Sequence, residues 1–199
     1  MPVSAPDRPS AGAAAAGVGI AVGRADVTEL ALARNRMPEL EGAAAAHGFT
    51  FPPIGRAVAT ANALVLGVRP DRWLLLTAAD VAGATAARWQ ERFAGLAVAV
   101  DQSAGLAALL LTGPNARDLL ARGCRLDLAG DRFSSGRAAA TSIAQVATIL
   151  AALPAGILIL TPASTARHLH EWLLATARPF GLAPSLEISA STLFGYPDS

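Results

Sequence analysis

Only a few side chains in this sequence have the type and spacing to do chemistry, and Asp101 is the foremost of them. It ends an alternating run that starts at Leu96, and it lies two residues before Ser103. A single carboxylate without a partner acid or base is poor evidence for catalysis. The other interpretation is an Asx turn, in which the Asp101 side chain accepts a hydrogen bond from the Ser103 amide. The sequence favours the turn.

The histidines and the cysteine form no metal-binding or nucleophilic pattern. His168 and His170 are two apart on a predicted helix, so they point about 200° from each other and cannot chelate one metal. We expect both to face solvent and His47 to lie at a helix end. Cys124 is interpreted as a packed thiol, which suggests a reducing compartment. The sequence has no H-x-x-x-H, C-x-x-C, phosphate-loop or nucleophile-elbow pattern, and it predicts no catalytic, cofactor-binding or metal-binding residue.

Composition narrows the function classes. The chain has 199 residues and a net charge of +1, and all of its 16 basic residues are arginines. The absence of lysine excludes a Schiff-base or Walker lysine. Because the arginines are scattered and mostly near acids, no nucleic-acid partner is expected. A hydrophobic fraction of 53% is typical of a globular chain with a real core.

The elements around Asp101 are predicted to be a strand, a turn, a strand and a helix. The first strand alternates, with Val98 and Val100 on the half-buried side. The second, residues 106–111, is almost wholly apolar, as in a strand buried on both faces. The helix begins at Pro114 and ends at Gly123.

Shorter segments precede this region. The spacing of apolar residues in 26–36 fits a strand and a helix equally well. The segment from Pro38 to His47 predicts a helix, with Gly48 beyond its end. The next segment, Phe49 to Gly55, carries two prolines and is predicted to be a surface loop.

A hairpin and a further helix follow. Residues 64–67 and 72–77 predict a hairpin around Pro70 and Asp71, with Trp73 anchoring the second strand. The helix after it is expected to start at a Thr77 or Asp80 cap and to end near Phe93, with Val81, Thr85 and Trp89 on its buried stripe.

No charged residue occurs between Ala138 and Ala166, so a membrane span has to be weighed. Pro154 to Gly156 divides the stretch in two, and enrichment in Ile, Val and Thr on both sides favours a buried β-hairpin. Thr161 and Pro162 then begin a last helix, which ends at Arg178.

The organisation predicted is one α+β domain, residues 25–182, with helices packed on a mainly antiparallel sheet. Residues 1–24, rich in Ala, Gly and Pro, are predicted to be a flexible tail, and residues 183–199 a C-terminal tail.

Three motifs in order carry a family resemblance. Asp101-x-Ser103, an apolar strand and then Gly113-Pro-x-Ala-Arg-x-Leu-Leu120 resemble the aminomethyltransferase-related folate-domain superfamily. Arg69-Pro-Asp-Arg-Trp-Leu-Leu-Leu76 narrows the resemblance to the gamma subunit of heterotetrameric sarcosine oxidase. So does Gly123-Cys-Arg-Leu-Asp-Leu128, followed by Phe133, Gly136 and Thr141. The matching segments lie between Leu64 and Phe180.

The resemblance implies a non-catalytic, structural subunit. The assembled enzyme would oxidatively demethylate sarcosine to glycine, produce hydrogen peroxide and pass the one-carbon unit to tetrahydrofolate. The partner alpha, beta and delta subunits would carry FAD, FMN, NAD, tetrahydrofolate and zinc, and this chain no cofactor. A cytoplasmic location without a membrane partner is expected. The interface would include Trp73, Arg132, Phe133 and Trp172.

Two alternatives stay open. A free-standing folate-binding protein or aminomethyltransferase-like one-carbon enzyme would need a sizeable pocket with an acid beside it. Asp101 is the candidate acid, because a carboxylate beside a strand end could serve a pterin or an amine in the resembled superfamily. The hypothesis of a membrane-associated protein rests only on the uncharged stretch.

For residues 26–36 the resemblance implies an edge element of the sheet.

Overall fold

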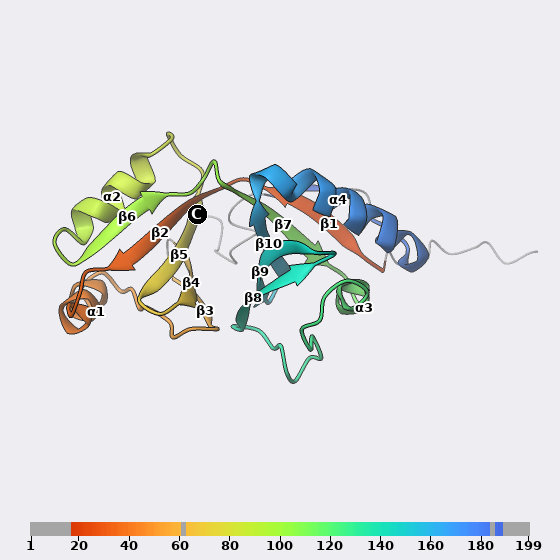
Figure 1. Ribbon diagram of the computed structural model, residues 1–199, viewed down its shortest axis with the longest axis horizontal. Coiled ribbons are helices and arrows are strands. Elements are labelled where there is room, and N and C mark those ends of the chain that lie inside the picture. The colour runs from red at the N-terminus through yellow and green to blue at the C-terminus, as the bar shows by residue number, and fades with distance from the viewer. Residues whose placement is uncertain (1–16, 61–62, 184–185, 189–199) are drawn as a thin grey trace, which may run out of the picture.

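The computed structural model describes residues 17–60, 63–183 and 186–188. These residues form two sheets with helices on their outer sides (Figure 1). Every pairing between named strands is antiparallel except the pairing of β1 with β11. The predicted α+β class is confirmed, with two sheets in place of one.

The first sheet has five strands, and helices α1 (Met37–Ala45) and α2 (Ala84–Arg92) cover one of its faces. Its order is β3 (Ala57–Ala59), β4 (Leu64–Arg69), β5 (Arg72–Ala78), β2 (Ala25–Leu32) and β6 (Ala97–Asp101).

The second sheet has six strands, and helices α3 (Ala116–Ala121) and α4 (Ala163–Ala177) cover it; the 3₁₀ turn η1 (Arg178–Phe180) follows α4. Its order is β11 (Leu186–Ile188), β1 (Gly19–Gly23), β7 (Leu106–Thr112), β10 (Gly156–Pro162), β9 (Val146–Leu153) and β8 (Ala138–Ile143).

A two-stranded ribbon runs through both sheets (Figure 1). β1 continues into β2 and β6 into β7, and the two runs pair in each sheet. Between the flanking pairs, four residues separate Gly23 from Thr28, whereas six separate Asp101 from Ala108. The longer run therefore bends out of the ladder, and this bend holds the Asp101 turn.

A second junction joins the sheets at their other side. Arg56 and Arg137 form an isolated antiparallel bridge between the start of β3 and the start of β8. Ala57 N–H donates to the Gly136 carbonyl, and Ala138 N–H donates to the Gly55 carbonyl, both at 2.9 Å. We call this bridge of Arg56 and Arg137 the seam.

The core lies in three layers. Apolar residues from both sheets, most of them leucines, fill the central layer, which we call the central core: Val27, Ala57, Leu64, Leu66, Leu74, Leu76, Ala108, Leu110, Ala138, Ala151, Leu158 and Leu160. The second layer packs α1 and α2 on the first sheet, and the third packs α3 and α4 on the second. Burial of each leucine contributes about 2 kcal/mol, so the central core holds the two sheets together.

The predicted tail boundaries are corrected. Residues 19–23 form strand β1, and Val18 and Ile20 are buried in the core. Glycine suits this strand because a Cβ on Gly19 would lie 2.5 Å from Thr112 Oγ1. At the other end, β11 pairs with β1 in parallel register. Residues 1–16, 184–185 and 189–199 of the predicted tails lie outside the described residues.

Strand β2 also corrects an expectation. Residues 25–32 lie between β5 and β6, so this segment is an interior strand and not the edge element that the resemblance implied. Strand β6 next to it is at an edge of the sheet, and the buried side of β6 is opposite to the predicted one. Ala97 is 3% exposed, whereas Val98 and Val100 are 55% and 45% exposed.

Helix α2 begins later than predicted. Its N-cap is Gly83, which has a φ of 77° and no side-chain cap. Thr77 lies in β5, and Val81 precedes the helix and is 72% exposed, so it does not belong to the buried stripe. Thr85 and Trp89 are buried as expected.

Both hairpin predictions are confirmed. β4 and β5 pair across a turn in which Asp71 has a φ of 56°, the left-handed conformation that Asp tolerates. The uncharged stretch forms β8, β9 and β10, with β9 and β10 joined at Pro154 to Gly156. In the part of the chain that the structure describes, no helix has both the length and the apolar character needed to cross a membrane.

Candidate functional site

An open hollow of about 320 Å³ lies beside the bend of the ribbon. Both runs of the ribbon line it, together with one residue from the loop after β5: Gly23, Arg24, Ala25, Asp26, Val27, Ala79, Ser103, Leu106, Ala107 and Ala108. Its volume is at the lower limit of small-molecule sites, which measure about 300–1,000 Å³. The folate-binding alternative requires a pocket, and this hollow is a candidate for it.

Asp26 is the buried carboxylate of the hollow, and only 8% of the residue is exposed. Its Oδ2 accepts hydrogen bonds from the Thr85 hydroxyl at 2.7 Å and from the Asp80 N–H at 3.1 Å. Both donors belong to α2 or to the loop before it. The Asp26 carboxylate therefore fixes helix α2 against strand β2.

Arg88 extends this network at the surface. Its Nη2 donates to Asp80 Oδ2 at 2.7 Å and to Thr85 Oγ1 at 3.1 Å. The hydrogen bond and charge of Arg88, together with the Val81 N–H, lower the pKa of Asp80 below its ordinary value. The network consists of one ion pair and the hydrogen bonds that surround it.

Asp101 forms the predicted Asx turn. Its Oδ1 accepts hydrogen bonds from the Ser103 N–H at 2.9 Å and from the Ser103 hydroxyl at 2.6 Å. These bonds, the hydroxyl bond foremost, lower the pKa of Asp101. Ser103 Oγ in turn accepts the Val27 N–H at 3.0 Å. The exposed Asp101 carboxylate thus shapes the bend, and it is Asp26 that lines the hollow.

Sequence reasoning missed Asp26 because the residues around it did not distinguish strand from helix. A signal was nevertheless present. Asp26 is followed by Val27 and Thr28, and an acid at the start of a buried β-branched run requires donors nearby.

The remaining candidate residues lie apart. Cys124 is buried, with its Sγ 3.7 Å from Thr141 Oγ1, as expected for a packed thiol. His47 and His168 are exposed, whereas His170 is half-buried and its Nε2 is buried without a hydrogen bond. The expected solvent exposure of His170 is therefore wrong. Among the described residues, no three His, Cys, Asp or Glu side chains cluster closely enough to hold a metal.

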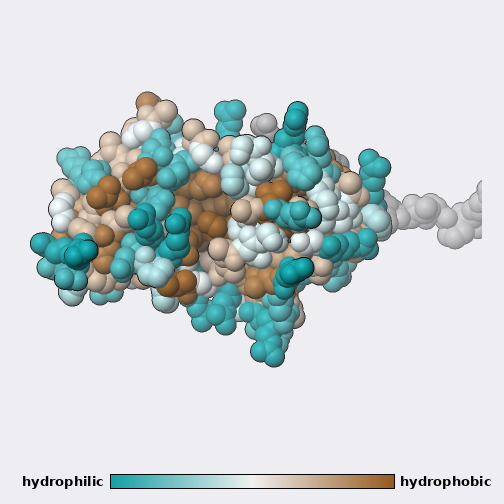
Figure 2. All heavy atoms as spheres, viewed as in Figure 1, coloured by the Kyte–Doolittle hydropathy of each residue, from teal (hydrophilic) through white to brown (hydrophobic). Residues whose placement is uncertain are grey.

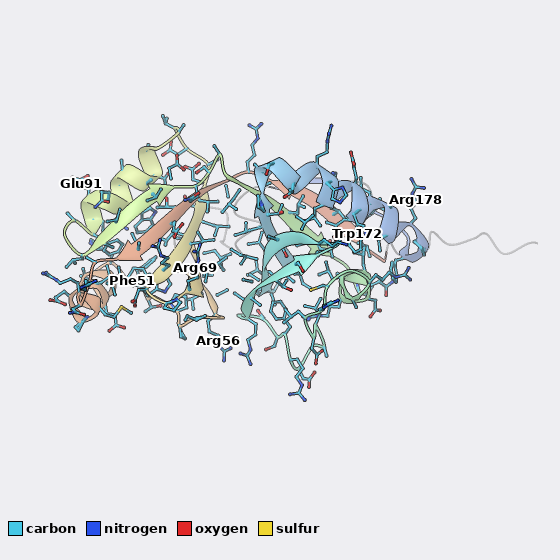
Figure 3. All side chains as sticks on the ribbon, in the orientation of Figure 1. Phe51, Arg56, Arg69, Glu91, Trp172 and Arg178 are labelled. Atoms are coloured by element: carbon cyan, nitrogen blue, oxygen red, sulfur yellow. The ribbon has the colours of Figure 1, made fainter. Side chains whose placement is uncertain are left out.

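The predicted interface residues divide into buried and accessible ones. Trp73 is 5% exposed and its Nε1 donates to the Pro52 carbonyl at 2.9 Å, and Phe133 is 4% exposed. Their expected contribution of exposed apolar surface is corrected, since both lie in the core. Trp172 lies on helix α4 (Figure 3) and is half-buried. A Cβ on Gly123 would lie 2.6 Å from its indole ring. Arg132 is exposed beside Asp131. An interface role for Arg132 and Trp172 stays a prediction.

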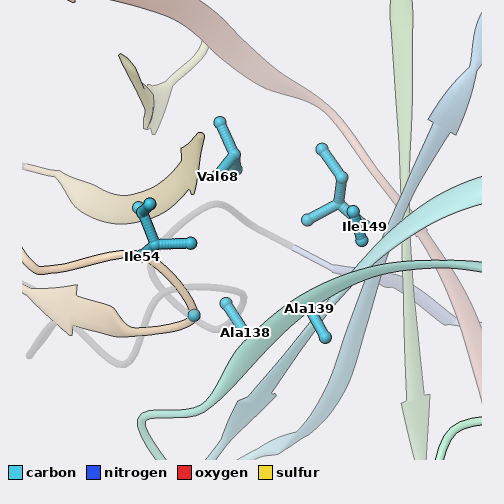
Figure 4. A pocket seen from close by; sticks show the side chains of 8 residues that line it. Ile54, Val68, Ala138, Ala139 and Ile149 are labelled. Carbon is cyan, nitrogen blue, oxygen red and sulfur yellow. The ribbon is translucent and has the colours of Figure 1, made fainter. Parts of the chain in front are cut away.

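A smaller hollow of about 50 Å³ lies beside the seam (Figure 4). Its lining is apolar and comes from both sheets: Ile54, Gly55, Gly67, Val68, Ala138, Ala139, Ala140 and Ile149. Apolar side chains also gather over the middle of the face seen in Figure 2, between the two sheets. Ile54, Val98 and Val100 are exposed by 58%, 55% and 45%.

Proteins of known structure share this fold. The chain matches a chain of heterotetrameric sarcosine oxidase from Corynebacterium sp. U-96, determined in complex with pyrrole 2-carboxylate, with a TM-score of 0.72 and 25% identity. The match covers 83% of this chain and 86% of that one. This chain shares the fold of the folate-binding domains of sarcosine oxidase and aminomethyltransferase. The resemblance predicted from the sequence motifs is confirmed.

Glycine cleavage system aminomethyltransferase T from Bartonella henselae shows the same fold, with a TM-score of 0.62 and 17% identity. The match covers 89% of this chain but 49% of that one, so this chain spans about half the length of the transferase. No protein-family model and no curated protein sequence matches the chain.

Proposed function

We propose that this chain is a structural subunit of a sarcosine oxidase-like complex and corresponds to its gamma subunit. The observation that carries the proposal is the match to a chain of heterotetrameric sarcosine oxidase over 83% of one chain and 86% of the other. Because the two shares are nearly equal, the matched chain is about as long as this one. In the resembled family the alpha and beta subunits are large chains, so a match to a chain of similar length favours the gamma subunit.

The polar groups in the described region support a scaffold role. Asp26 holds helix α2, and Asp101 forms the turn that bends the ribbon. Arg117 donates to the carbonyls of Leu128 and Phe133 and so fixes the long loop before β8. These three polar side chains each hold an element of the fold in place.

In this proposal the complex oxidatively demethylates sarcosine to glycine in the cytoplasm, with release of hydrogen peroxide and transfer of the one-carbon unit to tetrahydrofolate. The alpha, beta and delta partners hold FAD, FMN, NAD, tetrahydrofolate and zinc. This chain holds none of them and completes the assembly.

Co-expression tests the proposal. A tagged copy of this chain is produced together with the sarcosine oxidase alpha, beta and delta chains encoded in the same genome. We expect the four chains to purify together and to release peroxide with sarcosine. Purification of this chain by itself, or equal peroxide yield from complexes made with and without it, contradicts a required structural role.

A second candidate function rests on the 320 Å³ hollow with its buried Asp26. A free-standing folate-binding protein or aminomethyltransferase-like enzyme would place a pterin or amine there. Calorimetric titration of the isolated chain with tetrahydrofolate distinguishes the two. Stoichiometric uptake that Asp26→Asn abolishes favours the second function, and no heat of binding favours the first.

A further inference from the structure

The seam places two positive charges directly opposite each other. The main-chain hydrogen bonds flank Arg56 and Arg137 without joining them, since they link Ala57 with Gly136 and Ala138 with Gly55. This pattern defines a non-hydrogen-bonded antiparallel pair, whose Cα atoms lie about 4.5 Å apart and whose side chains leave the same face. Like charges in this position destabilise the ladder.

Nothing in the described part of the chain neutralises the two charges. Both arginines are exposed, and neither has an ion pair, a side-chain hydrogen bond or an aromatic contact there. Arg36, Arg72, Arg88, Arg132 and Arg167, by contrast, each lie within 4.0 Å of an acid. Figure 3 shows Arg56 at the lower edge of the molecule, where the sheets meet.

An apolar hollow lies next to the two arginines. Gly55, which precedes Arg56, and Ala138, which follows Arg137, line the 50 Å³ hollow, and Ile54 beside it is 58% exposed (Figure 4). A liquid water molecule occupies about 30 Å³, so the hollow has room for the end of one aliphatic side chain. Its apolar lining offers water no hydrogen-bond partner from a side chain.

We propose that the seam is a docking site for an acidic segment of a partner subunit, in which a Glu or Asp carboxylate binds between Arg56 and Arg137. Charge complementarity selects this partner, because paired guanidinium groups bind carboxylate oxygens with two parallel hydrogen bonds each. An aliphatic side chain of the same segment enters the apolar hollow. The inference rests on the proposed function and names the chemistry of the subunit contact.

One substitution separates docking from folding. Arg56→Glu places a carboxylate opposite Arg137, so it replaces a repulsive cross-strand pair with an attractive one. In the isolated chain we expect the melting temperature to rise by about 1–4 °C. In the complex, the same change removes half of the anion site and repels the partner carboxylate.

Binding is measured by interferometry against an immobilised assembly of the alpha, beta and delta chains. We expect Arg56→Glu to raise Kd by at least about tenfold, and the wild-type Kd to rise with salt. Arg34→Glu is the matched control, since Arg34 is also exposed, and it should bind like the wild type.

Four outcomes would overturn the seam inference, the subunit proposal or both. Wild-type binding that Arg56→Glu leaves unchanged overturns the seam inference and keeps the subunit proposal. No wild-type binding overturns both. A lower melting temperature for Arg56→Glu means that the arginine pair stabilises the chain, which also overturns the inference. Self-association of this chain that Arg56→Glu abolishes would assign the seam to a second copy.

Discussion

The Thr85 hydroxyl donates a 2.7 Å hydrogen bond to the buried Asp26 carboxylate, and this bond joins helix α2 to strand β2. The pair spans 59 residues of sequence and sets the position of the helix at one end. The other end of α2 is held by Phe93, which is fully buried in the layer beneath it.

Replacement of Thr85 by valine should therefore destabilise the chain. The side chain keeps its shape, but a buried carboxylate loses its shortest donor, which costs about 1–3 kcal/mol. Urea denaturation followed by tryptophan fluorescence measures the change. Thr50→Val is the control, because Thr50 is exposed and its substitution should change stability by less than about 0.5 kcal/mol. Equal stability of the two variants would show that the Thr85 bond contributes nothing.

Gln90 closes the open edge of β6. Its Oε1 accepts the Ala99 N–H at 2.9 Å, and its Nε2 donates to the Ala97 carbonyl at 3.2 Å. These are the main-chain groups that a foreign strand would bind. We expect Gln90→Ala to cause concentration-dependent self-association in sedimentation velocity. Glu91→Ala, an exposed change on the same helix, should stay monomeric; if both variants stay monomeric, Gln90 does not guard the edge.

The Asx turn predicts a pH effect. Because hydrogen bonds from Ser103 lower the folded-state pKa of Asp101, protons bind the unfolded state first. The contribution is fully present above the unfolded pKa of about 3.9 and is lost as pH falls through the lower folded value. Asp101→Asn keeps an acceptor oxygen but cannot titrate, so its stability should fall less steeply between about pH 5 and pH 3. Parallel curves for wild type and variant would contradict this effect.

Two glycines should respond oppositely to alanine. A Cβ at Gly67 would lie 2.8 Å from the Pro52 carbonyl oxygen, whereas one at Gly42 in helix α1 meets no atom within 4 Å. Overpacking makes Gly67→Ala destabilising by about 1–3 kcal/mol. Gly42→Ala should stabilise the chain by about 0.5–1 kcal/mol, as alanine favours a helix. Thermal melts of both variants give the signs, and the same sign for both would be inconsistent with this packing.

Local signals in the sequence predicted the hairpins, helices α1 and α4, and the Asp101 turn. Pro70 and Asp71 define one hairpin turn, and Pro154 to Gly156 another, without help from distant residues. These features depend on residues that are neighbours in the chain, so they can be predicted from the sequence alone.

Features that depend on distant residues were missed. β1 is made of Gly, Ala, Ile and Val, and the need for a glycine at position 19 becomes evident only once Thr112 lies against it. The valines of β6 face outward because the alanines of that strand pack under α2. The role of Asp26 likewise depends on Thr85, which lies 59 residues away.

The subunit proposal is tested most directly by the mass of the particle that contains this chain. Light scattering coupled to size-exclusion chromatography, applied to the chain co-expressed with the alpha, beta and delta subunits, measures that mass. We expect one peak whose mass equals the sum of the four chains, with this chain at one copy. A peak of 20.2 kDa for this chain, separate from the other three, would contradict it.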